Sequence, residues 1–434
     1  MILSKFLSNK SFAIYGLGVT GSSVIKYFKN SKIKNYLAWD DDKKKRKVFK
    51  IKFKINKFLK SLSDVDYIVI SPGINLEKSK YKRYLLKNKH KLITDLDIFY
   101  MADIAAKSIV VTGTNGKSTT CKIIEHMLKK NKKKVQLGGN IGRPILSLKL
   151  KKDIIYVIET SSFQLEYSKF IKPTYAIILN IVKDHLDWHK TMKKYIDAKY
   201  KIFSLQDKKN YAFLKNKKLI SKFYSKKSLA KLKIVKSKSY SQIKNNIKNI
   251  YLSSKANKEN MEFVYELSKV LKITKKNLIK SLFTFKGLPH RHEIFLKKKN
   301  LQFINDSKAT SFEATKFALN NNKNIYWIVG GLPKLNDNIN LYNLKKKIIK
   351  VFIIGKHVNF FKNKLKNKIK FEVSKTLENS LISIFNEIKK FPNNNATVLL
   401  SPASASFDQY RNFNERGNNF KKLVNFYANK YLKR

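Results

Sequence analysis

The chain has 434 residues, of which 43% are hydrophobic and 12% aromatic, so it is expected to form buried cores in about two to four domains and not to be disordered. Its formal charge of +64 includes 93 basic residues, but only seven are Arg and the Lys residues lie in every segment, which favours a solvated surface over a nucleic-acid-binding face. The single cysteine, Cys121, excludes an intrachain disulfide, and the chain shows no signal-peptide run and no apolar run of about 18 residues, so we expect a cytoplasmic protein without membrane insertion.

Short β-rich runs alternate with helical stretches along the chain, which predicts parallel sheets connected by crossover helices. The first predicted strand, 12–15, runs into the stretch GLGVTG at 16–21, and an acid follows about 20 residues later at Asp40. Glycines in this pattern let backbone N–H groups approach a pyrophosphate, so it indicates a dinucleotide cofactor or a nucleotide diphosphate substrate. A tight turn into a helix remains the alternative. Further strands are predicted at 36–39 and 65–70.

A second unit begins with a shortened phosphate loop, VVTGTNGKSTT at 110–120. The usual pattern, G-x-x-x-x-G-K-[ST], would have Gly where Val111 stands. The loop N–H groups and the following helix N-terminus bind phosphate, Lys117 adds a positive charge, and Ser118 or Thr119 can reach Mg²⁺. This stretch therefore predicts a nucleoside triphosphate site.

Two polar stretches follow later strands of the same unit: Glu159 ends the run IIYVIE, and Asp184-His185 lies in NIVKDHLD. A carboxylate at the carboxyl edge of a parallel sheet, beside a phosphate loop, suits Mg²⁺, and an imidazole there can ligate a second metal. An ordinary strand-ending Glu and a structural His remain the alternatives. Residues 207–258 give weak signals, and we expect an edge of the fold there. The elements predicted in this unit are strands at 109–111, 154–158 and 175–179 and helices at 119–130, 192–203, 257–271 and 275–283.

A third α/β unit follows a plausible linker, GLP at 287–289. The stretch NDSKAT at 305–310 offers a carboxylate, an ammonium and hydroxyls between a strand and a helix. The stretch SPASASFDQYRNF at 401–413 offers hydroxyls and backbone donors at a helix entrance, which suits a small carboxylate substrate. The predicted elements are strands at 303–304, 325–329, 351–354 and 397–400 and helices at 311–319 and from about 413.

Together these motifs are similar to a known family. GTNGKST with the short cradle, ETSSFQLE at 159–166 and DH at 184–185 resemble the ATP domain of the Mur ligases and folylpolyglutamate synthases, which also lack the first phosphate-loop Gly. GLGVTG with SPGI at 71–74, GLPHRHE with NDSKAT, and SPASASFDQYRNFNERG resemble the D-glutamate-adding Mur ligases across essentially the whole chain. The resemblance implies an α/β fold with three domains: a Rossmann-like UDP-sugar-binding domain, a P-loop ATP-binding ligase domain and a Rossmann-like amino-acid-binding domain, over 1–95, 96–287 and 288–434.

The resemblance also implies roles for individual residues. Lys117, His185 and Lys199 would be catalytic, and Lys199, in DAKY at 197–200, matches the carbamylated lysine of the family; an ordinary surface lysine is the alternative. The implied metal ligands are Ser118, Glu159, His185 and Lys199. The implied UDP-sugar contacts are Val19, Thr20, Asp40, Gly73 and Asn140. The implied ATP contacts are Thr114, Asn115, Gly116, Lys117, Ser118, Thr119, Thr120, Asn257, Arg291 and Asp306. The implied D-glutamate contacts are Lys308, Thr310, Lys334, Ser406, Phe407 and Phe413.

The implied reaction is ATP-dependent ligation in peptidoglycan precursor synthesis, in which a carboxylate is phosphorylated and then coupled to an amine. The substrates would be UDP-N-acetylmuramoyl-L-alanine, D-glutamate and ATP, with two Mg²⁺ ions as cofactor, and the chain would be a monomer without a nucleic-acid partner. One alternative is another Mur or folylpolyglutamate-type ligase with a different amine. The other, from a different class, is a basic nucleic-acid-binding NTPase.

Overall fold

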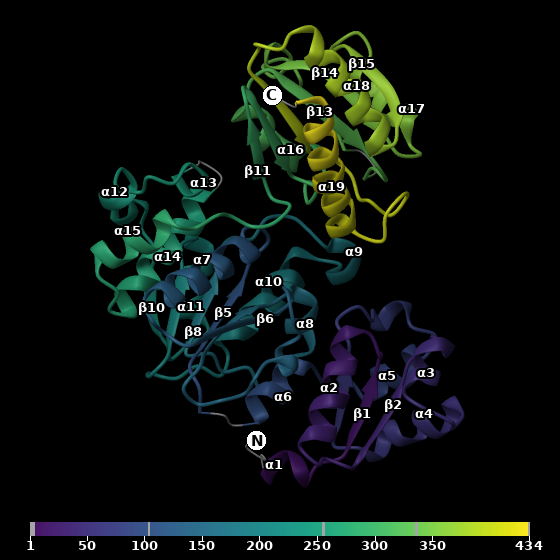
Figure 1. The fold of residues 1–434 in the computed structure, drawn as a ribbon. Coiled ribbons are helices and arrows are strands. Elements are labelled where there is room, and N and C mark those ends of the chain that lie inside the picture. The colour runs from purple at the N-terminus through teal and green to yellow at the C-terminus, as the bar shows by residue number, and fades with distance from the viewer. Residues whose placement is uncertain (1–4, 103–104, 254–256, 335–336, 433–434) are drawn as a thin grey trace. The chain divides into compact units, whose positions relative to one another are not determined.

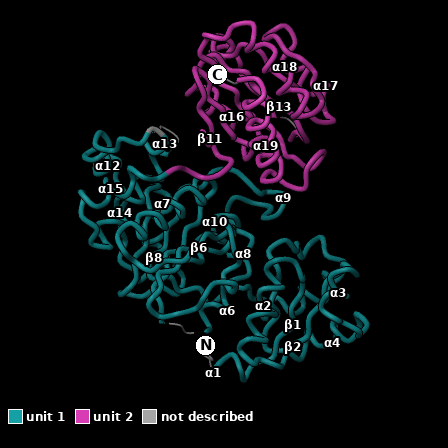
Figure 2. Tube along the Cα trace, viewed as in Figure 1, with its two compact units in different colours: residues 1–285 teal, residues 286–434 magenta. Residues whose placement is uncertain are grey.

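The computed structural model describes residues 5–102, 105–253, 257–334 and 337–432. The chain forms two compact units, Met1–Phe285 and Lys286–Arg434 (Figure 2). The first unit contains two separate sheets and the second contains one. The boundary predicted between residues 95 and 96 and the exact start of the third domain stay predictions.

The N-terminal sheet of the first unit has four parallel strands in the order β2-β1-β3-β4. Its strands β1 and β2 are labelled in Figure 1. Strand β1 (Phe12–Tyr15) is buried at all four positions, as expected for a parallel strand covered on both faces. The strands predicted around it are present, and the last of them is two residues shorter. The other elements are β2 (Tyr36–Trp39), β3 (Tyr67–Ile70), β4 (Leu92–Ile93), α1 (Lys5–Ser8), α2 (Val19–Asn30), α3 (Lys43–Val48), α4 (Ile55–Asp64), α5 (Lys82–Lys87) and α6 (Asp95–Met101), with 3₁₀ turns at Leu76–Lys78 and Lys89–Lys91.

The central sheet has six parallel strands in the order β10-β9-β8-β5-β7-β6. Strand β5 (Ser108–Thr112) lies inside the sheet and is buried throughout, so the loop after it emerges at the middle of the carboxyl edge. Residues 207–258, whose sequence shows weak signals of secondary structure, contain β9 and the edge strand β10, two strands that were not predicted. The other elements are β6 (Val135–Gly139), β7 (Ile155–Glu159), β8 (Tyr175–Ile178), β9 (Tyr211–Leu214), β10 (Lys231–Ile234), α7 (Lys117–Lys130), α8 (Ser162–Tyr167), α9 (Leu186–His189), α10 (Met192–Tyr200), α11 (Lys217–Ser225), α12 (Ser237–Lys244), α13 (Ile250–Ser253), α14 (Lys258–Val270) and α15 (Lys275–Phe283), with 3₁₀ turns at Ile145–Ser147 and Lys201–Phe203.

The second unit has six strands in the order β11-β12-β16-β13-β14-β15. Strand β11 (Glu293–Lys298) pairs antiparallel with β12 (Leu301–Asn305), so the expectation of purely parallel sheets is wrong at this edge. A connection of only two residues explains the difference, because a parallel pair needs a long crossover. The other elements are β13 (Ile325–Gly330), β14 (Ile348–Ile354), β15 (Phe371–Lys375), β16 (Ala396–Leu400), α16 (Phe312–Asn320), α17 (Val358–Leu365), α18 (Leu377–Lys390) and α19 (Phe413–Tyr431), with a 3₁₀ turn at Lys345–Lys347.

Separate apolar clusters cover the two faces of the sheet in the second unit. Strand residues such as Phe303 and Leu400 pack with α18 and α19, whereas Trp327 and Leu399 pack with α16 and α17. Burial of both faces explains why these strands read as apolar runs without alternation. Within the described ranges, no helix is long and apolar enough to cross a membrane.

Candidate active site

The phosphate loop connects β5 to α7, as predicted, and two glycines shape it. Gly113 has φ 152° and Gly116 has φ 82°, conformations that residues with a side chain rarely adopt. A Cβ at Gly116 would also overlap the side-chain oxygen of Asn260. Helix α7 then begins at Lys117, two residues earlier than predicted. The loop therefore needs Gly at 113 and 116, although the residue at 111 lies within the buried strand.

Two lysine side chains meet at the carbonyl oxygen of Gly113. Lys117 Nζ donates to Gly113 O at 2.9 Å and to Thr114 O at 2.8 Å. Lys199 Nζ, from α10, donates to the same Gly113 oxygen at 2.9 Å. The structure thus brings together two of the three predicted catalytic residues, Lys117 and Lys199, which are 82 positions apart in the chain.

Lys199 is 1% exposed, so the alternative of a surface lysine is wrong. Its Nζ lies 4.7 Å from the centroid of the Tyr195 ring, a cation–π distance. Burial, and then the charge of Lys117, lowers the pKa of the Lys199 ammonium to about 7. A large share of this amine is therefore unprotonated near neutral pH, which is uncommon for lysine.

Glu159 is the last residue of β7, and His185 lies in the connection after β8; these two strands flank β5 in the central sheet. The Glu159 side chain is buried; its Oε1 accepts a hydrogen bond from Asn140 Nδ2 at 2.9 Å, and its Oε2 has no hydrogen-bond partner in the described part of the chain. His185 precedes α9 with φ 52°, and its ring centroid lies 4.7 Å from that of Phe163. Burial lowers the pKa of His185, and the charges of Lys199 and Lys117 lower it further, whereas Asp184 opposes them.

The side chains described here do not form a ready metal cluster. Among the described residues, no group of three or more His, Cys, Asp and Glu side chains is arranged to hold a metal ion. Ser118 is half-buried on the first turn of α7, and Thr119 and Thr120 are buried behind it. The metal-ligand roles of Ser118, Glu159, His185 and Lys199 therefore stay predictions.

The remaining predicted ATP contact of the first unit lies directly behind the loop. Asn257 precedes α14 and is 6% exposed. Its Oδ1 accepts a hydrogen bond from Asn260 Nδ2 at 3.0 Å, and Asn260 in turn faces Gly116. A second support of the loop is Asn180, which was not among the predicted site residues; its backbone and side chain both bind the loop. Its position two residues after strand β8, at the carboxyl edge of the sheet, was the available signal.

A cavity of about 760 Å³ lies at the carboxyl edge of the N-terminal sheet. Residues that follow strand β6, such as Asn140 and Pro144, also line it. Gly16, with φ 97°, accepts a hydrogen bond at its oxygen from Ser71 Oγ at 2.9 Å, which holds the GLG turn against the SPGI turn. Asp40 accepts hydrogen bonds from Leu17 N at 2.6 Å and Asp42 N at 2.8 Å. All five residues predicted to contact the UDP-sugar line this one cavity: Val19, Thr20, Asp40, Gly73 and Asn140.

In the second unit, Asp306 is buried at the end of β12. Its Oδ2 accepts a hydrogen bond from Ser401 Oγ at 2.7 Å, and its Oδ1 accepts one from His292 N at 3.0 Å. Burial raises the pKa of Asp306 to about 7, although both hydrogen bonds and the charge of Arg291 oppose the shift. Arg291 thus lies close enough to Asp306 to act on its charge, and both stay predicted nucleotide contacts.

Five of the six residues predicted to bind D-glutamate lie in the connections that follow β12, β13 and β16, and the sixth, Phe413, begins α19. Lys308 Nζ lies 4.0 Å from the centroid of the Phe413 ring, and Ser406 is buried. Leu332 and Ala405 exchange two backbone hydrogen bonds, of 2.9 and 3.0 Å, which joins the loop of Lys334 to the loop of Ser406. Thr310 is half-buried, whereas Lys334 and Phe407 are exposed.

Arg416 is a further site-shaping residue to which the sequence analysis assigned no role. Its guanidinium is 1% exposed and donates to Ser307 O and Ser404 O, both at 2.9 Å, and to Ser307 Oγ at 3.0 Å. It therefore ties the NDSKAT turn to the SPASAS turn. The available signal was an Arg inside a motif of a chain whose cations are mostly Lys, because only Arg offers a rigid fork of five donors.

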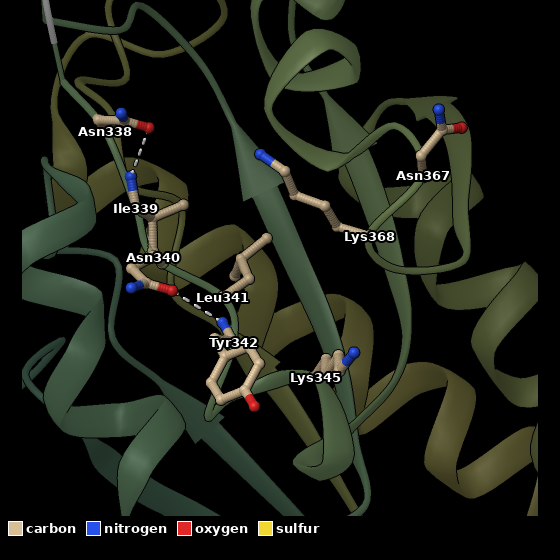
Figure 3. Close-up of a pocket in the computed structure, with 8 residues that line it drawn as sticks. All are labelled: Asn338, Ile339, Asn340, Leu341, Tyr342, Lys345, Asn367 and Lys368. Atoms are coloured by element: carbon tan, nitrogen blue, oxygen red, sulfur yellow. Dashed lines mark hydrogen bonds between the residues drawn. The ribbon is translucent and has the colours of Figure 1, made fainter.

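Another hollow of the second unit, of about 530 Å³, contains none of the predicted site residues (Figure 3). Asn338 and Asn340 turn their side-chain oxygens onto the backbone N–H groups of Ile339 and Tyr342, at 2.9 Å each. These bonds shape the local turn, and we assign no role to this hollow.

Comparison with known proteins agrees with this geometry. The family model of the Mur ligase middle domain matches residues 111–279, and that of the Mur ligase MurD-like N-terminal domain matches residues 10–90. UDP-N-acetylmuramoylalanine–D-glutamate ligase of Wolbachia sp. subsp. Brugia malayi is 34% identical, over 97% of this chain and 97% of its own. The ligase of the same name from Buchnera aphidicola subsp. Acyrthosiphon pisum is 35% identical, over 96% and 98%. The chain belongs to the Mur ligase family.

Solved structures agree with the fold of this Mur ligase. UDP-N-acetylmuramate–alanine ligase from Thermotoga maritima aligns with a TM-score of 0.55 over 96% of this chain and all of its own, at 15% identity. The MurF ligase from the same organism, solved in complex with ADP, also aligns with a TM-score of 0.55, over 98% and 100% at 13% identity. The predicted fold class, with Rossmann-like N-terminal and C-terminal domains and a central ATPase domain, is confirmed.

Proposed function

We propose that this Mur ligase adds D-glutamate to UDP-N-acetylmuramoyl-L-alanine in cytoplasmic peptidoglycan precursor synthesis, using ATP and an acyl-phosphate intermediate. The observation that carries the chemistry is the meeting of Lys117 and Lys199 on Gly113 O, within the phosphate loop. The choice of substrates is supported by relatives over 30% identical across at least 95% of the chain, all named for the same ligation. We further propose that the chain acts as a monomer with three domains, 1–95, 96–287 and 288–434.

The reaction proceeds in two displacements. A carboxylate oxygen of the UDP-linked substrate attacks the γ-phosphorus of ATP, and the bond to ADP breaks. The amine nitrogen of D-glutamate then attacks the acyl carbon, the acyl C–O bond breaks, and the amine loses a proton as phosphate leaves. Residues 114–120 would surround the ATP phosphates. The N–H groups at the start of α7 and the Lys117 ammonium stabilise the charge that spreads over the transferring phosphoryl group.

One buried oxygen supports the binding of a magnesium ion. Glu159 Oε2 is a buried carboxylate oxygen without a hydrogen-bond partner among the described residues, and Mg²⁺ prefers oxygen ligands of this kind. Ser118, Glu159, His185 and carbamylated Lys199 would hold two ions. When bound, Mg²⁺ neutralises phosphate charge during transfer.

Lys199 would become a metal ligand by carbamylation. Its nitrogen attacks CO₂, a C–N bond forms, and one proton is released, which leaves an anionic carbamate. The buried position beside the loop supports this role, because a protonated ammonium there would repel both Lys117 and a metal ion. The carbamate oxygens would supply the anionic ligand that an uncharged amine lacks.

The substrates would occupy the loops described above. The cavity of about 760 Å³ would take the UDP-sugar, and Asn257, Arg291 and Asp306 would contact ATP beyond its phosphates. Lys308, Thr310, Lys334, Ser406, Phe407 and Phe413 would surround D-glutamate. Binding several substrates in one complex supplies the proximity that the second displacement requires.

The deciding experiment measures phosphate release from ATP by the full chain with UDP-N-acetylmuramoyl-L-alanine. We expect release to require D-glutamate, to yield the ligated product, and to be unaffected by DNA or RNA. Equal activity with L-glutamate would favour the alternative of a ligase with a different amine. Release stimulated by nucleic acid and independent of any amino acid would favour the NTPase alternative and refute the proposal.

A further inference from the structure

In the connection after β8, Val182 contacts the Thr114 side chain of the phosphate loop, and Asn180 binds the loop backbone. Thr114 N donates to Asn180 O at 2.9 Å, and Asn115 N donates to Asn180 Oδ1 at 2.8 Å. Asn180 Nδ2 donates back to Asn115 O at 3.3 Å. One residue therefore binds two consecutive loop residues, and the side-chain bonds require one particular orientation of its amide, because a flipped amide would direct its NH₂ group at the N–H of Asn115.

Glu259 selects that orientation. It lies in the first turn of α14, and its Oε2 accepts a hydrogen bond from Asn180 Nδ2 at 2.6 Å. A carboxylate can only accept hydrogen bonds, so the NH₂ group of Asn180 must face Glu259 and its oxygen must face Asn115. Hydrogen bonds to an ionised acceptor are short and about twice as strong as neutral ones. A flip of the Asn180 amide would lose this strong bond to Glu259, and the neutral bonds to Asn115 would not replace it.

The same turn of α14 contacts the loop at a second place. Asn260, next to Glu259 in sequence, is 5% exposed and places its side-chain oxygen against Gly116. It is in turn held by its hydrogen bond to Asn257. Helix α14 therefore supports the loop at Thr114–Asn115, through Asn180, and at Gly116, through direct contact.

We propose that Glu259 is a positioning residue for the phosphate loop, acting through Asn180 to hold Thr114 and Asn115 in the conformation that receives the nucleotide. This inference rests on the proposed function, because it assumes that the loop binds ATP. Glu259 does not need to touch the nucleotide. It contributes by accepting the hydrogen bond from Asn180, and a neutral amide oxygen at this place can accept the same bond more weakly.

The test compares variants of the full chain in two measurements: equilibrium binding of ADP with Mg²⁺, and KM for ATP and for D-glutamate. Glu259→Ala should weaken ADP binding and raise KM for ATP by about tenfold, the scale for losing a hydrogen bond to a charged group. KM for D-glutamate should stay within about twofold, because the second unit is unchanged. Glu259→Gln, whose side-chain oxygen can still accept from Asn180, should restore most of the affinity.

Two controls separate positioning from a general effect on the helix. Glu266 lies on the same helix and pairs with Lys269 at 2.8 Å, so Glu266→Ala should leave both KM values unchanged. Asn180→Asp cannot donate to Glu259 and should be impaired like Glu259→Ala. Adding Glu259→Gln to Asn180→Asp should restore binding, because the Gln amide can donate to the new carboxylate.

The inference is overturned if Glu259→Ala binds ADP within twofold of the wild type, if Glu259→Gln is as weak as Glu259→Ala, or if the double variant is no better than Asn180→Asp. The last comparison needs only the two Asn180 variants, so it decides the question even if Glu259→Ala does not fold. Wild-type protein that fails to bind ADP with Mg²⁺ would instead refute the proposed function of the loop.

Discussion

Replacing Gly116 by Ala is the sharpest test of the phosphate loop. Gly116 has φ 82°, in the left-handed region, and an added Cβ would overlap the Asn260 side-chain oxygen. Asn260 is buried and its Nδ2 donates to Asn257 Oδ1 at 3.0 Å, so it can move aside only by breaking that bond. The substitution therefore acts on the loop in two separate ways.

The two effects can be given magnitudes. An L-residue in the left-handed region costs about 1–2 kcal/mol, and losing one buried hydrogen bond costs about 1 kcal/mol. Because about 1.4 kcal/mol is a factor of ten, a total of about 2–3 kcal/mol predicts that kcat/KM for ATP falls by about 30- to 140-fold.

The assay is D-glutamate-dependent phosphate release at varied ATP concentration. We compare Gly116→Ala and Asn260→Ala with the double variant. In the double variant the Cβ added at position 116 no longer meets the side-chain oxygen of Asn260. The effects of the two single substitutions on kcat/KM should therefore be non-additive, with a coupling free energy of about 1 kcal/mol. Additive effects would show that Asn260 does not restrict residue 116, and a fall of less than threefold in Gly116→Ala would refute the requirement for Gly.

Further predictions concern the lysine site, the second unit and pH. Lys199→Ala should lose nearly all activity, and added acetate should restore part of it by supplying an anionic oxygen. Lys193→Ala, at an exposed position on the same helix, should be near wild type. Full activity of Lys199→Ala in CO₂-free buffer would contradict the carbamate. Arg416→Lys should lower the free energy of unfolding by about 2–3 kcal/mol, the scale for breaking several buried charged hydrogen bonds, as read from urea denaturation, and should raise KM for D-glutamate; an unchanged midpoint would show that the guanidinium bonds contribute little. Burial lowers the pKa of His292 to about 4, and an unfolded His titrates near 6.5, so the unfolded chain binds more protons between these values and stability falls as pH decreases through this window. Between pH 7 and pH 5 wild type should lose about 1–2 kcal/mol more than His292→Gln in urea denaturation, and parallel losses in the two proteins would contradict the assignment.

Several features of this protein are determined locally and could be predicted from its sequence. Strand β1 is a short apolar run that leads into glycines, and the loop at 110–120 contains the Gly and Lys residues that a phosphate cradle needs. Such signals come from backbone conformation and from the spacing of apolar residues, which neighbouring residues control. The same locality explains why the predicted strands and helices around these motifs are present.

Other features depend on contacts between distant segments, and only the tertiary structure decided them. Strand β10 reads KLKI and is mostly exposed, so its pairing with β9 provides the order that its own sequence does not. Glu259 and Asn180 are 79 positions apart, and Arg416 binds Ser307 across 109 positions. A polar residue at such a place looks like any solvated side chain in a sequence, because its role arises only when the chain folds and removes it from water beside a particular partner.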